Sequence, residues 1–257
     1  MKDKTKNNSI IKEYKEENSI QNIAKKKNKS YSKIRKLLVL NNISRRPCGR
    51  NVKYLKLSLK QKQIILGTLL GDGCFIKRRR RIYALCITHG GKQEEYLKWK
   101  TDQLKETIGG NIYKRDRYDK RTDKIYISLD YHSRSHPFLN ELYTELWKDG
   151  RKGINVKVLN MLTPLGIAIW YCDDGNLYQN KDTNHLSIAT NSLKEEELKI
   201  VIRFFKEKYN LDFHQNRKII RLVSLKEIHK FINIFSKYIP KCMKYKKILK
   251  CFKKIKI

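Results

Sequence analysis

Two aspartates of this chain, Asp72 and Asp174, each end an apolar stretch and are each followed by a glycine. The carboxyl end of a helix already carries partial negative charge from its unpaired carbonyl groups, so packing alone gives no reason for an acid there. Two carboxylates held close together stay ionised only when cations lie beside them. Oxygen ligands of this kind suit Mg²⁺, which also binds phosphate. The pair therefore predicts a divalent-metal site.

Both apolar stretches have the end signals of helices. Ser58 and Gln61 have the spacing of a capping box, in which each side chain bonds the amide of the other residue. Ahead of the second stretch, Thr163 stands where a cap belongs, and Pro164 occupies the first helical position, where no amide hydrogen bond is lost. These signals predict one helix after Ser58 and another from Pro164.

Small residues recur four apart inside both predicted helices: Gly67, Gly71, Ala168 and Cys172. An interior glycine costs a helix about 1 kcal/mol relative to alanine, so a close approach of two backbones must compensate. We expect the two helices to pack on each other through these four residues. This packing would bring Asp72 and Asp174 to the same end of the helix pair.

The two aspartates are 102 residues apart (174 − 72 = 102), and the same offset relates further residues. It pairs Gly73 with Gly175, Thr88 with Thr190 and Arg115 with Arg217. Lysine and glutamate matches at this offset have little weight in so charged a chain. The glycine, aspartate and threonine matches keep one ungapped register with the helix ends, which indicates an internal duplication.

The stretches 65–73 and 167–175 resemble the two motifs of single-chain LAGLIDADG homing endonucleases, and the resemblance covers about residues 55–250. It implies an α/β (α+β) fold built as a pseudo-twofold αββαββα duplication, with the motif helices between the halves and antiparallel sheets that bind DNA. It also implies a monomeric, site-specific endonuclease with Mg²⁺ as its cofactor. Such an enzyme hydrolyses both strands of double-stranded DNA at a long asymmetric target.

By this resemblance the catalytic residues are Asp72, Asp174, Lys152 and Lys246, and the metal ligands are Asp72, Asp174, Gly71 and Asp173. A lysine near the metal would orient the attacking water or stabilise charge on the phosphate. Two assignments stay open. Asp173 has a second interpretation as a local cap or hydrogen-bond partner, and either lysine position could instead be filled by Arg151, Lys244 or Lys247.

The formal net charge of +34, from 59 lysines and arginines against 25 acids, dominates the composition. Such an excess of positive charge repels itself in a compact fold and favours a polyanionic partner. An AT-rich genome would raise the number of lysines without selection for binding, but it does not explain the shortage of balancing acids. The charge therefore predicts a nucleic acid as the partner, with double-stranded DNA first and intron RNA second.

Several other classes of protein are disfavoured. No apolar run approaches the ~18 residues of a membrane span, and the N-terminus lacks a signal-peptide pattern. We therefore expect an intracellular protein of the cytoplasm, nucleoid or an organelle that is neither secreted nor membrane-bound. The six cysteines include no Cys-x-x-Cys pair, which argues against structural zinc and against a disulfide framework. His132 and His136 are expected to be polar loop residues.

Residues 1–50 are predicted to form a separate all-α unit. Its spacing of isoleucines and leucines resembles the helix-turn-helix of recombinases and transposase-associated proteins. Ser30 would cap the third helix, whose side chains would enter the major groove: Tyr31, Lys33, Arg35 and Lys36. A three-helix cap that only stabilises its neighbour is the alternative. A linker at 51–57 and two halves at 58–160 and 161–257 complete the predicted organisation.

Each half is predicted to follow its motif helix with two strands, a helix, two strands and a helix. The first half has a hairpin over 74–88, a helix over 93–108, strands at 111–115 and 124–129, and a helix over 137–147. The second half has strands at 176–178 and 185–190, a helix over 195–209, strands at 213–217 and 219–223, and a helix over 227–238.

A sheet can bury one face and offer the other to phosphates and base edges. The DNA contacts predicted for the two halves are Lys77, Arg79, Arg81, Arg115 and Arg217. For the basic run 77–81, a solvated turn is the alternative.

Two other functions stay open. A catalytically inactive DNA-binding regulator of transcription can have the same fold, although intact Asp72 and Asp174 argue against lost chemistry. An intron RNA maturase would use the same basic surface on RNA, and the sequence itself does not separate it from the nuclease.

Overall fold

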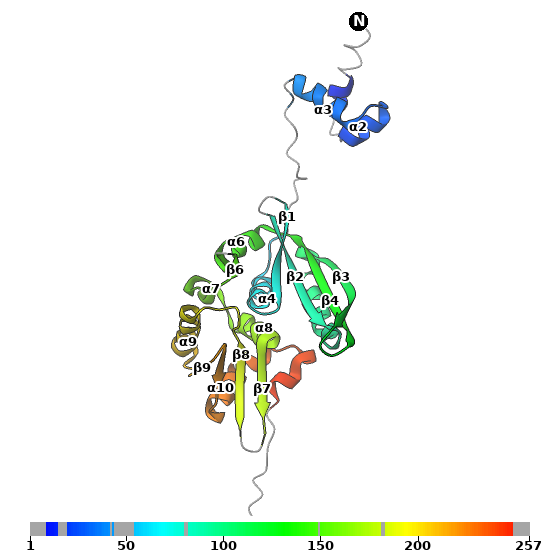
Figure 1. Cartoon of the computed structure of the whole chain (residues 1–257). Coiled ribbons are helices and arrows are strands. Elements are labelled where there is room, and N and C mark those ends of the chain that lie inside the picture. The colour runs from blue at the N-terminus through cyan, green and yellow to red at the C-terminus, as the bar shows by residue number, and fades with distance from the viewer. Residues whose placement is uncertain are drawn as a thin grey trace, which may run out of the picture. The chain divides into compact units, whose positions relative to one another are not determined.

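The computed structural model describes residues 9–14, 20–41, 43, 54–79, 82–148, 150–180 and 183–248. The chain divides into two units, Met1–Lys53 and Tyr54–Ile257 (Figure 1). The predicted boundaries at 50 and 160 remain predictions. Of the predicted linker, residues 51–53 lie outside the described residues, and residues 54–57 form neither helix nor strand.

The first unit contains a helix at residues 9–14, α2 (Ile20–Lys26) and α3 (Tyr31–Leu40). Its buried apolar side chains form a cluster of their own: Ile10, Tyr14, Ile20, Ile23, Ala24, Ile34 and Leu38. Ser30 caps α3 as predicted, because its hydroxyl accepts a hydrogen bond from the Lys33 amide at 3.4 Å. The four side chains predicted to face DNA are all exposed: Tyr31, Lys33, Arg35 and Lys36. Their role in DNA recognition stays a prediction.

The second unit contains the duplicated order of elements that the sequence predicts. The first half consists of α4 (Leu59–Leu70), β1 (Gly73–Arg79), β2 (Ile82–Gly90), α5 (Glu94–Ile108), β3 (Gly110–Asp119), β4 (Lys124–Ser135) and α6 (Pro137–Leu146). The second half consists of α8 (Pro164–Asp174), β7 (Gly175–Gln179), β8 (Asn184–Ala189), α9 (Glu195–Tyr209), β9 (His214–Asn216), β10 (Ile219–Leu222) and α10 (Leu225–Phe235). Both halves therefore run αββαββα.

Each half contains one four-stranded antiparallel sheet, in the order β1-β2-β4-β3 or β7-β8-β10-β9. The outer hairpins differ in length, because β3 pairs with β4 from Gly110/Ser133 to Asp119/Lys124, whereas β9 pairs with β10 only over His214–Asn216. The strands predicted at 111–115 and 124–129 are therefore too short. Nearly every residue of β3 is exposed, so no alternation of buried and exposed side chains marks its length in the sequence.

Short connecting elements that the sequence did not predict follow each half. A small hairpin of β5 (Trp147–Lys148) and β6 (Arg151–Lys152) turns at Gly150, which has a φ of +74°. The helix α7 (Val156–Met161) then leads to α8. Two 3₁₀ segments, η2 (Ser236–Tyr238) and η3 (Lys241–Lys247), follow α10, and η1 (Gly91–Gln93) precedes α5.

The two halves are not related by one ungapped offset along their whole length. Gly73 of β1 pairs with Ile87, and Gly175 of β7 pairs with Ile188, so β2 and β8 are related by 101 residues (188 − 87 = 101). The predicted match of Thr88 with Thr190 is therefore wrong as a structural equivalence. The position equivalent to Thr190 is His89 (190 − 101 = 89), because the hairpin of the second half is one residue shorter.

The start of each motif helix is fixed by hydrogen bonds. The predicted capping box is present, since the Ser58 hydroxyl accepts from the Gln61 amide at 3.2 Å and the Ser58 amide donates to Gln61 Oε1 at 2.9 Å. Thr163 occupies the cap position of α8, but its hydroxyl caps no amide. Instead, buried Gln63 of α4 accepts from the Thr163 amide at 2.8 Å and donates to the Met161 carbonyl at 2.8 Å. One side chain of α4 therefore fixes the beginning of α8.

Figure 1 shows α4 and α8 side by side at the junction of the halves. The two helices approach each other through glycines. A Cβ atom added to Gly67 would lie 2.3 Å from the Gly166 carbonyl oxygen, and one added to Gly71 would lie 2.4 Å from Asp173 Cβ. The predicted α8 contacts, Ala168 and Cys172, are buried, but the nearest α8 atoms belong to Gly166, Ile169 and Asp173. Residues three and four apart share a helix face, so 166, 169 and 173 form the contact and 168 and 172 lie beside it.

A single apolar core joins the two halves. Its cluster of buried side chains includes Leu66 of α4 and Ile169 of α8, together with Ile87 and Ile188 from the two sheets. Among the described residues, no helix is both long and apolar enough to cross a membrane.

We expect Gly67→Ala to lower the free energy of unfolding by about 1–3 kcal/mol, because the new methyl group would meet the backbone of α8. Urea denaturation followed by circular dichroism measures the change. Gly90→Ala is the matched control, since Gly90 has a φ of −68° and nothing lies within 4 Å of its added Cβ. Equal stability of the two variants would contradict a close helix contact at Gly67.

Candidate active site

The carboxyl ends of α4 and α8 bring three aspartates together. The Asp72 amide donates to Asp173 Oδ2 at 3.4 Å, and Asp174 follows Asp173 on α8. Burial raises the pKa of Asp72 to about 6, and the negative charge of Asp173 raises it further. Burial and the charge of Asp72 raise the pKa of Asp174 to about 7. Burial and neighbouring carboxylates therefore favour the protonated forms of both predicted catalytic acids.

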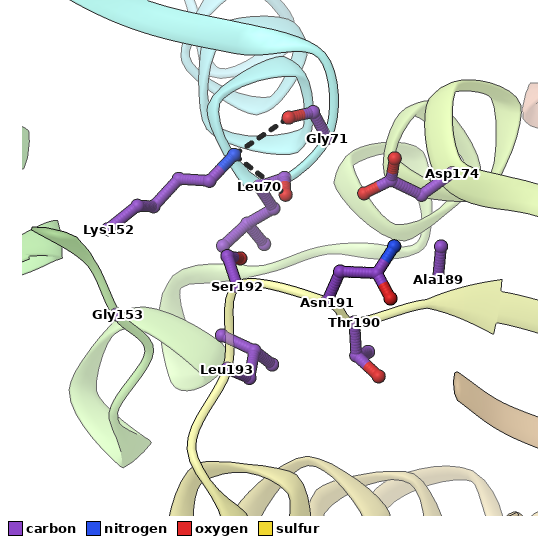
Figure 2. A pocket seen from close by; sticks show the side chains of 10 residues that line it. All are labelled: Leu70, Gly71, Lys152, Gly153, Asp174, Ala189, Thr190, Asn191, Ser192 and Leu193. Atoms are coloured by element: carbon purple, nitrogen blue, oxygen red, sulfur yellow. Dashed lines mark hydrogen bonds between the residues drawn. The ribbon is translucent and has the colours of Figure 1, made fainter. Parts of the chain in front are cut away.

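The two predicted lysines lie at equivalent places on the two halves. Lys152 donates to the carbonyl oxygens of Gly71 at 2.7 Å and Leu70 at 3.3 Å, as Figure 2 shows. Lys246 donates to those of Cys172 at 2.5 Å and Gly175 at 2.7 Å. Each lysine thus binds the carbonyl end of one motif helix, where the partial charge is negative.

Burial lowers the pKa of both Lys152 and Lys246, although nearby carboxylates act in the opposite direction. Two of the alternatives considered from the sequence are engaged elsewhere. Arg151 makes a two-pronged ion pair with Glu197, at 2.9 and 3.0 Å, and Lys247 donates to the Ser236 carbonyl at 2.9 Å. The geometry therefore favours Lys152 and Lys246 for the two positions.

A buried ion pair that the sequence analysis missed crosses from one half to the other. Lys100 of α5 donates to both carboxylate oxygens of Asp173, at 2.7 and 2.9 Å, and neither side chain is exposed. The Lys100 ammonium also lies 4.4 Å from the centre of the Tyr96 ring. The sequence contained one signal, since Lys100 lies on the apolar face of its helix together with Leu97 and Leu104.

His89 of β2 connects this ion pair to Asp72. Its Nε2 lies 3.3 Å from Lys100 Nζ, and its Nδ1 lies 3.3 Å from Asp72 Oδ2 and 3.1 Å from Gln93 Oε1. Burial lowers the pKa of His89 to about 4, and the charge of Lys100 lowers it further. The ring is therefore neutral at physiological pH.

Ligand atoms of Asp72, His89 and Asp173 all lie within 4.8 Å of one another, which is close enough for one cation. The Lys100 ammonium already bonds both oxygens of Asp173 and faces the His89 ring, so it supplies the positive charge that this cluster needs. This favours the interpretation of Asp173 as a local hydrogen-bond partner. The acids without such a partner are Asp72 and Asp174.

Asp174 lines a pocket together with Leu70, Gly71 and Lys152. Figure 2 shows its carboxylate across from Lys152, with Thr190 and Asn191 on the loop that follows β8. The Thr190 hydroxyl donates away from Asp174, to the Lys218 carbonyl at 2.9 Å. The surroundings of the two predicted catalytic acids therefore differ.

The residues predicted to contact DNA are spread over both sheets. Lys77 is exposed on β1, and Arg217 is exposed in the turn between β9 and β10. Arg115 of β3 pairs with Asp130 at 2.9 Å, while its side chain remains 61% exposed. The side chain of Arg79 and the whole of Arg81 lie outside the described residues. The sequence analysis missed the exposed apolar and aromatic side chains of the β3–β4 hairpin: Ile112, Tyr113, Tyr118, Ile125, Tyr126 and Ile127.

Comparisons with known proteins agree with this arrangement. The model of the LAGLIDADG DNA endonuclease family matches residues 62–241. The DNA endonuclease I-ChuI of Chlamydomonas applanata is 27% identical over 215 residues, which cover 75% of this chain and 96% of that protein. The structure of the homing endonuclease I-WcaI bound to its DNA recognition sequence superimposes with a TM-score of 0.70 at 22% identity, over 82% of this chain and 98% of that one, so the two share a fold.

Other relatives are much longer proteins. Protein RecA of Mycolicibacterium flavescens is 39% identical over 123 residues, which cover 47% of this chain and 27% of that protein. Among the RecA proteins that it matches, the chain spans between 27% and 47% of the length of the relative.

We expect Asp174→Asn to raise the melting temperature in the presence of EDTA at pH 8, and the difference from wild type to vanish below pH 4. Between its ordinary pKa of 3.8 and a folded-state pKa of about 7, Asp174 holds a proton that the unfolded chain has released. The free energy of unfolding therefore falls as pH rises through this window, and the amide removes that loss.

Thermal denaturation from about pH 3 to pH 8 checks this expectation. Asp102→Asn, which changes an exposed acid of α5, is the control and should follow the wild type. An Asp174→Asn protein that melts below the wild type at pH 8 would mean that the carboxylate makes net stabilising contacts.

Proposed function

Because the chain belongs to the LAGLIDADG DNA endonuclease family, we propose that it is a homing endonuclease that cuts both strands of a specific DNA site. The observation that carries this proposal is the pairing of Asp72 and Asp174 at the ends of two tightly packed helices. Lys152 and Lys246 each bind carbonyl groups at the end of one motif helix beside these acids, and they share the equivalent pair Leu70 and Cys172. A DNA-binding regulator without nuclease activity would not need these two acids and two lysines at the helix ends.

The site residues fit a divalent metal. Burial and like charge raise the pKa values of Asp72 and Asp174, so both carboxylates gain when a cation neutralises them. The donor set is oxygen only: these two carboxylates, with the Gly71 carbonyl as a further ligand, and this set suits Mg²⁺. When bound, the metal supplies positive charge that stabilises the phosphate during hydrolysis.

The remaining groups of the site have distinct tasks in this proposal. Lys152 and Lys246 hold ammonium groups at the two helix ends, where they place positive charge beside a bound phosphate or orient the attacking water. Lys100 keeps Asp173 neutralised, so that Asp173 does not compete with Asp72 and Asp174 for the metal. One chain contains both halves of the site, so we propose that the enzyme acts as a monomer.

The surfaces around the site suit double-stranded DNA. The net charge of +34 supplies attraction to phosphates, and exposed side chains of both sheets supply contacts along the grooves. The β3–β4 hairpin is much longer than the β9–β10 hairpin. We therefore propose an asymmetric target, with more of it contacted by the first half than by the second.

Cleavage of DNA in the presence of Mg²⁺ tests the proposal. With a target selected from a DNA library, the wild-type protein should make double-strand breaks. Asp72→Asn and Asp174→Asn should each reduce double-strand cleavage by about 100-fold or more while retaining DNA affinity. The Asp102→Asn protein should cut like the wild type, because Asp102 is an exposed acid of α5.

Two outcomes would contradict the nuclease. Tight binding of DNA without any cleavage would support the inactive regulator, and preferential binding of intron RNA would support the maturase. Loss of DNA binding in the aspartate variants would mean that these acids maintain the structure.

We also propose that α3 of the first unit binds DNA. Replacing Lys33, Arg35 and Lys36 together by alanine should weaken binding and lower the slope of log K against log salt by about 0.9 for each lost phosphate contact. Lys12→Ala is the control, because Lys12 is exposed on another helix of the same unit. An unchanged slope in the triple variant would mean that the unit only stabilises its neighbour.

A further inference from the structure

We infer that His89 is a positioning residue that orients the carboxylate of Asp72. Because the described residues of the second half include no such residue beside Asp174, the two halves of the site should cut their DNA strands at rates that depend differently on His89. This inference rests on the proposed nuclease function. It starts from a chain of polar groups that runs from the Asp173 side chain of the second half through buried Lys100 and His89 to the partly exposed Asp72 carboxylate of the first half.

The contacts of Lys100 fix which nitrogen of His89 bears a proton. A lysine ammonium has three hydrogens to donate and no acceptor. Lys100 lies within hydrogen-bonding distance of both Asp173 oxygens and of His89 Nε2, at 2.7, 2.9 and 3.3 Å. Nε2 faces a donor and must therefore accept. The ring proton then lies on Nδ1, which faces the carboxylate of Asp72 at 3.3 Å and the amide oxygen of Gln93 at 3.1 Å.

This tautomer gives His89 the role of a donor and excludes it as a metal ligand. A ligating nitrogen needs a free lone pair, and Nδ1 in this form has none. The Nδ1–H group donates to Gln93 Oε1 at 3.1 Å and lies 3.3 Å from Asp72 Oδ2, and this contact favours one orientation of the Asp72 carboxylate. Groups that orient a metal-binding or catalytic side chain in this way commonly change affinity or activity by 10- to 100-fold when they are removed.

Among the described residues of the second half, no equivalent chain of groups leads to Asp174. The register of β2 and β8 places Thr190 where the first half has His89, and the Thr190 hydroxyl donates to the Lys218 carbonyl. The helix α9 begins 101 residues after α5 (195 − 94 = 101), so buried Val201 stands where α5 has Lys100. The position of Asp173 is occupied by Gly71 in the first motif (173 − 102 = 71). The three residues that lead to Asp72, which are Asp173, Lys100 and His89, therefore have no counterparts leading to Asp174 in the described part of the chain.

A strand-resolved cleavage assay tests this inequality. In a duplex with each strand labelled separately, His89→Leu should slow cutting of one strand by about 10- to 100-fold, leave the other near the wild-type rate and accumulate nicked DNA. His89→Asn should recover part of the lost rate, because its amide places a donor near the position of Nδ1. His229→Gln, an exposed histidine of α10, should cut both strands like the wild type.

A spectroscopic measurement tests the same inference without any cleavage. The ¹⁵N chemical shifts of the His89 ring in the metal-free protein should report a proton on Nδ1, and a proton on Nε2 would overturn the inference. Equal slowing of both strands by His89→Leu in a folded, DNA-binding protein would also overturn it, while the nuclease proposal would survive. If the wild-type protein cuts neither strand, the proposed function fails and the inequality of strand cutting fails with it.

Discussion

The close contact between α4 and α8 is the constraint on which the rest of the second unit depends. Gly67 leaves no room for a side chain between the two backbones, and Gly71 leaves none between α4 and Asp173. Gln63 fixes the beginning of α8 against α4, so the helices cannot slide along each other without breaking buried hydrogen bonds. Because the helices are fixed at both ends, Asp72 and Asp174 stand at the same end of the helix pair. The same helix contact joins the buried apolar side chains of both halves into one core. The helix pair therefore both positions the acids and stabilises the fold.

Three aspartates in one place repel one another, and the structure compensates their negative charges to different degrees. Asp173 receives a full buried partner in Lys100, which comes from the other half of the chain. Removing one member of such a pair typically costs about 3–5 kcal/mol, because the other charge is left buried and uncompensated. Lys152 and Lys246 bind helix carbonyls, so their charges only partly offset those of Asp72 and Asp174. Burial, and after it the like charge of neighbouring carboxylates, raises the pKa values of these two carboxyls.

The sequence predicted the features that arise from local rules. The capping box at Ser58 and the helix over 195–209 follow from cap residues and periodicity, and both are present. The length of β3 was underestimated because its side chains are exposed on both faces, so no alternation of buried and exposed residues marks the strand. The ion pair of Lys100 and Asp173 depends on residues 73 positions apart (173 − 100 = 73), and no local rule connects them. The position of Lys100 on the apolar face of α5 was the one signal in the sequence. A buried lysine needs an acidic partner, but the sequence did not show which acid lies opposite it.

Duplication within one chain explains why the two halves differ so much in detail. A dimer of identical subunits must place the same residue on both sides of its axis, so a buried lysine on one side appears on the other as well. In a single chain, Lys100 can face Asp173 while Val201 stands at the related position. The outer hairpins differ in the same way, with a long β3–β4 pair and a short β9–β10 pair. The contact between α4 and α8 keeps Asp72 and Asp174 together. The residues outside this contact can differ between the halves, so each half can fit a different part of an asymmetric partner.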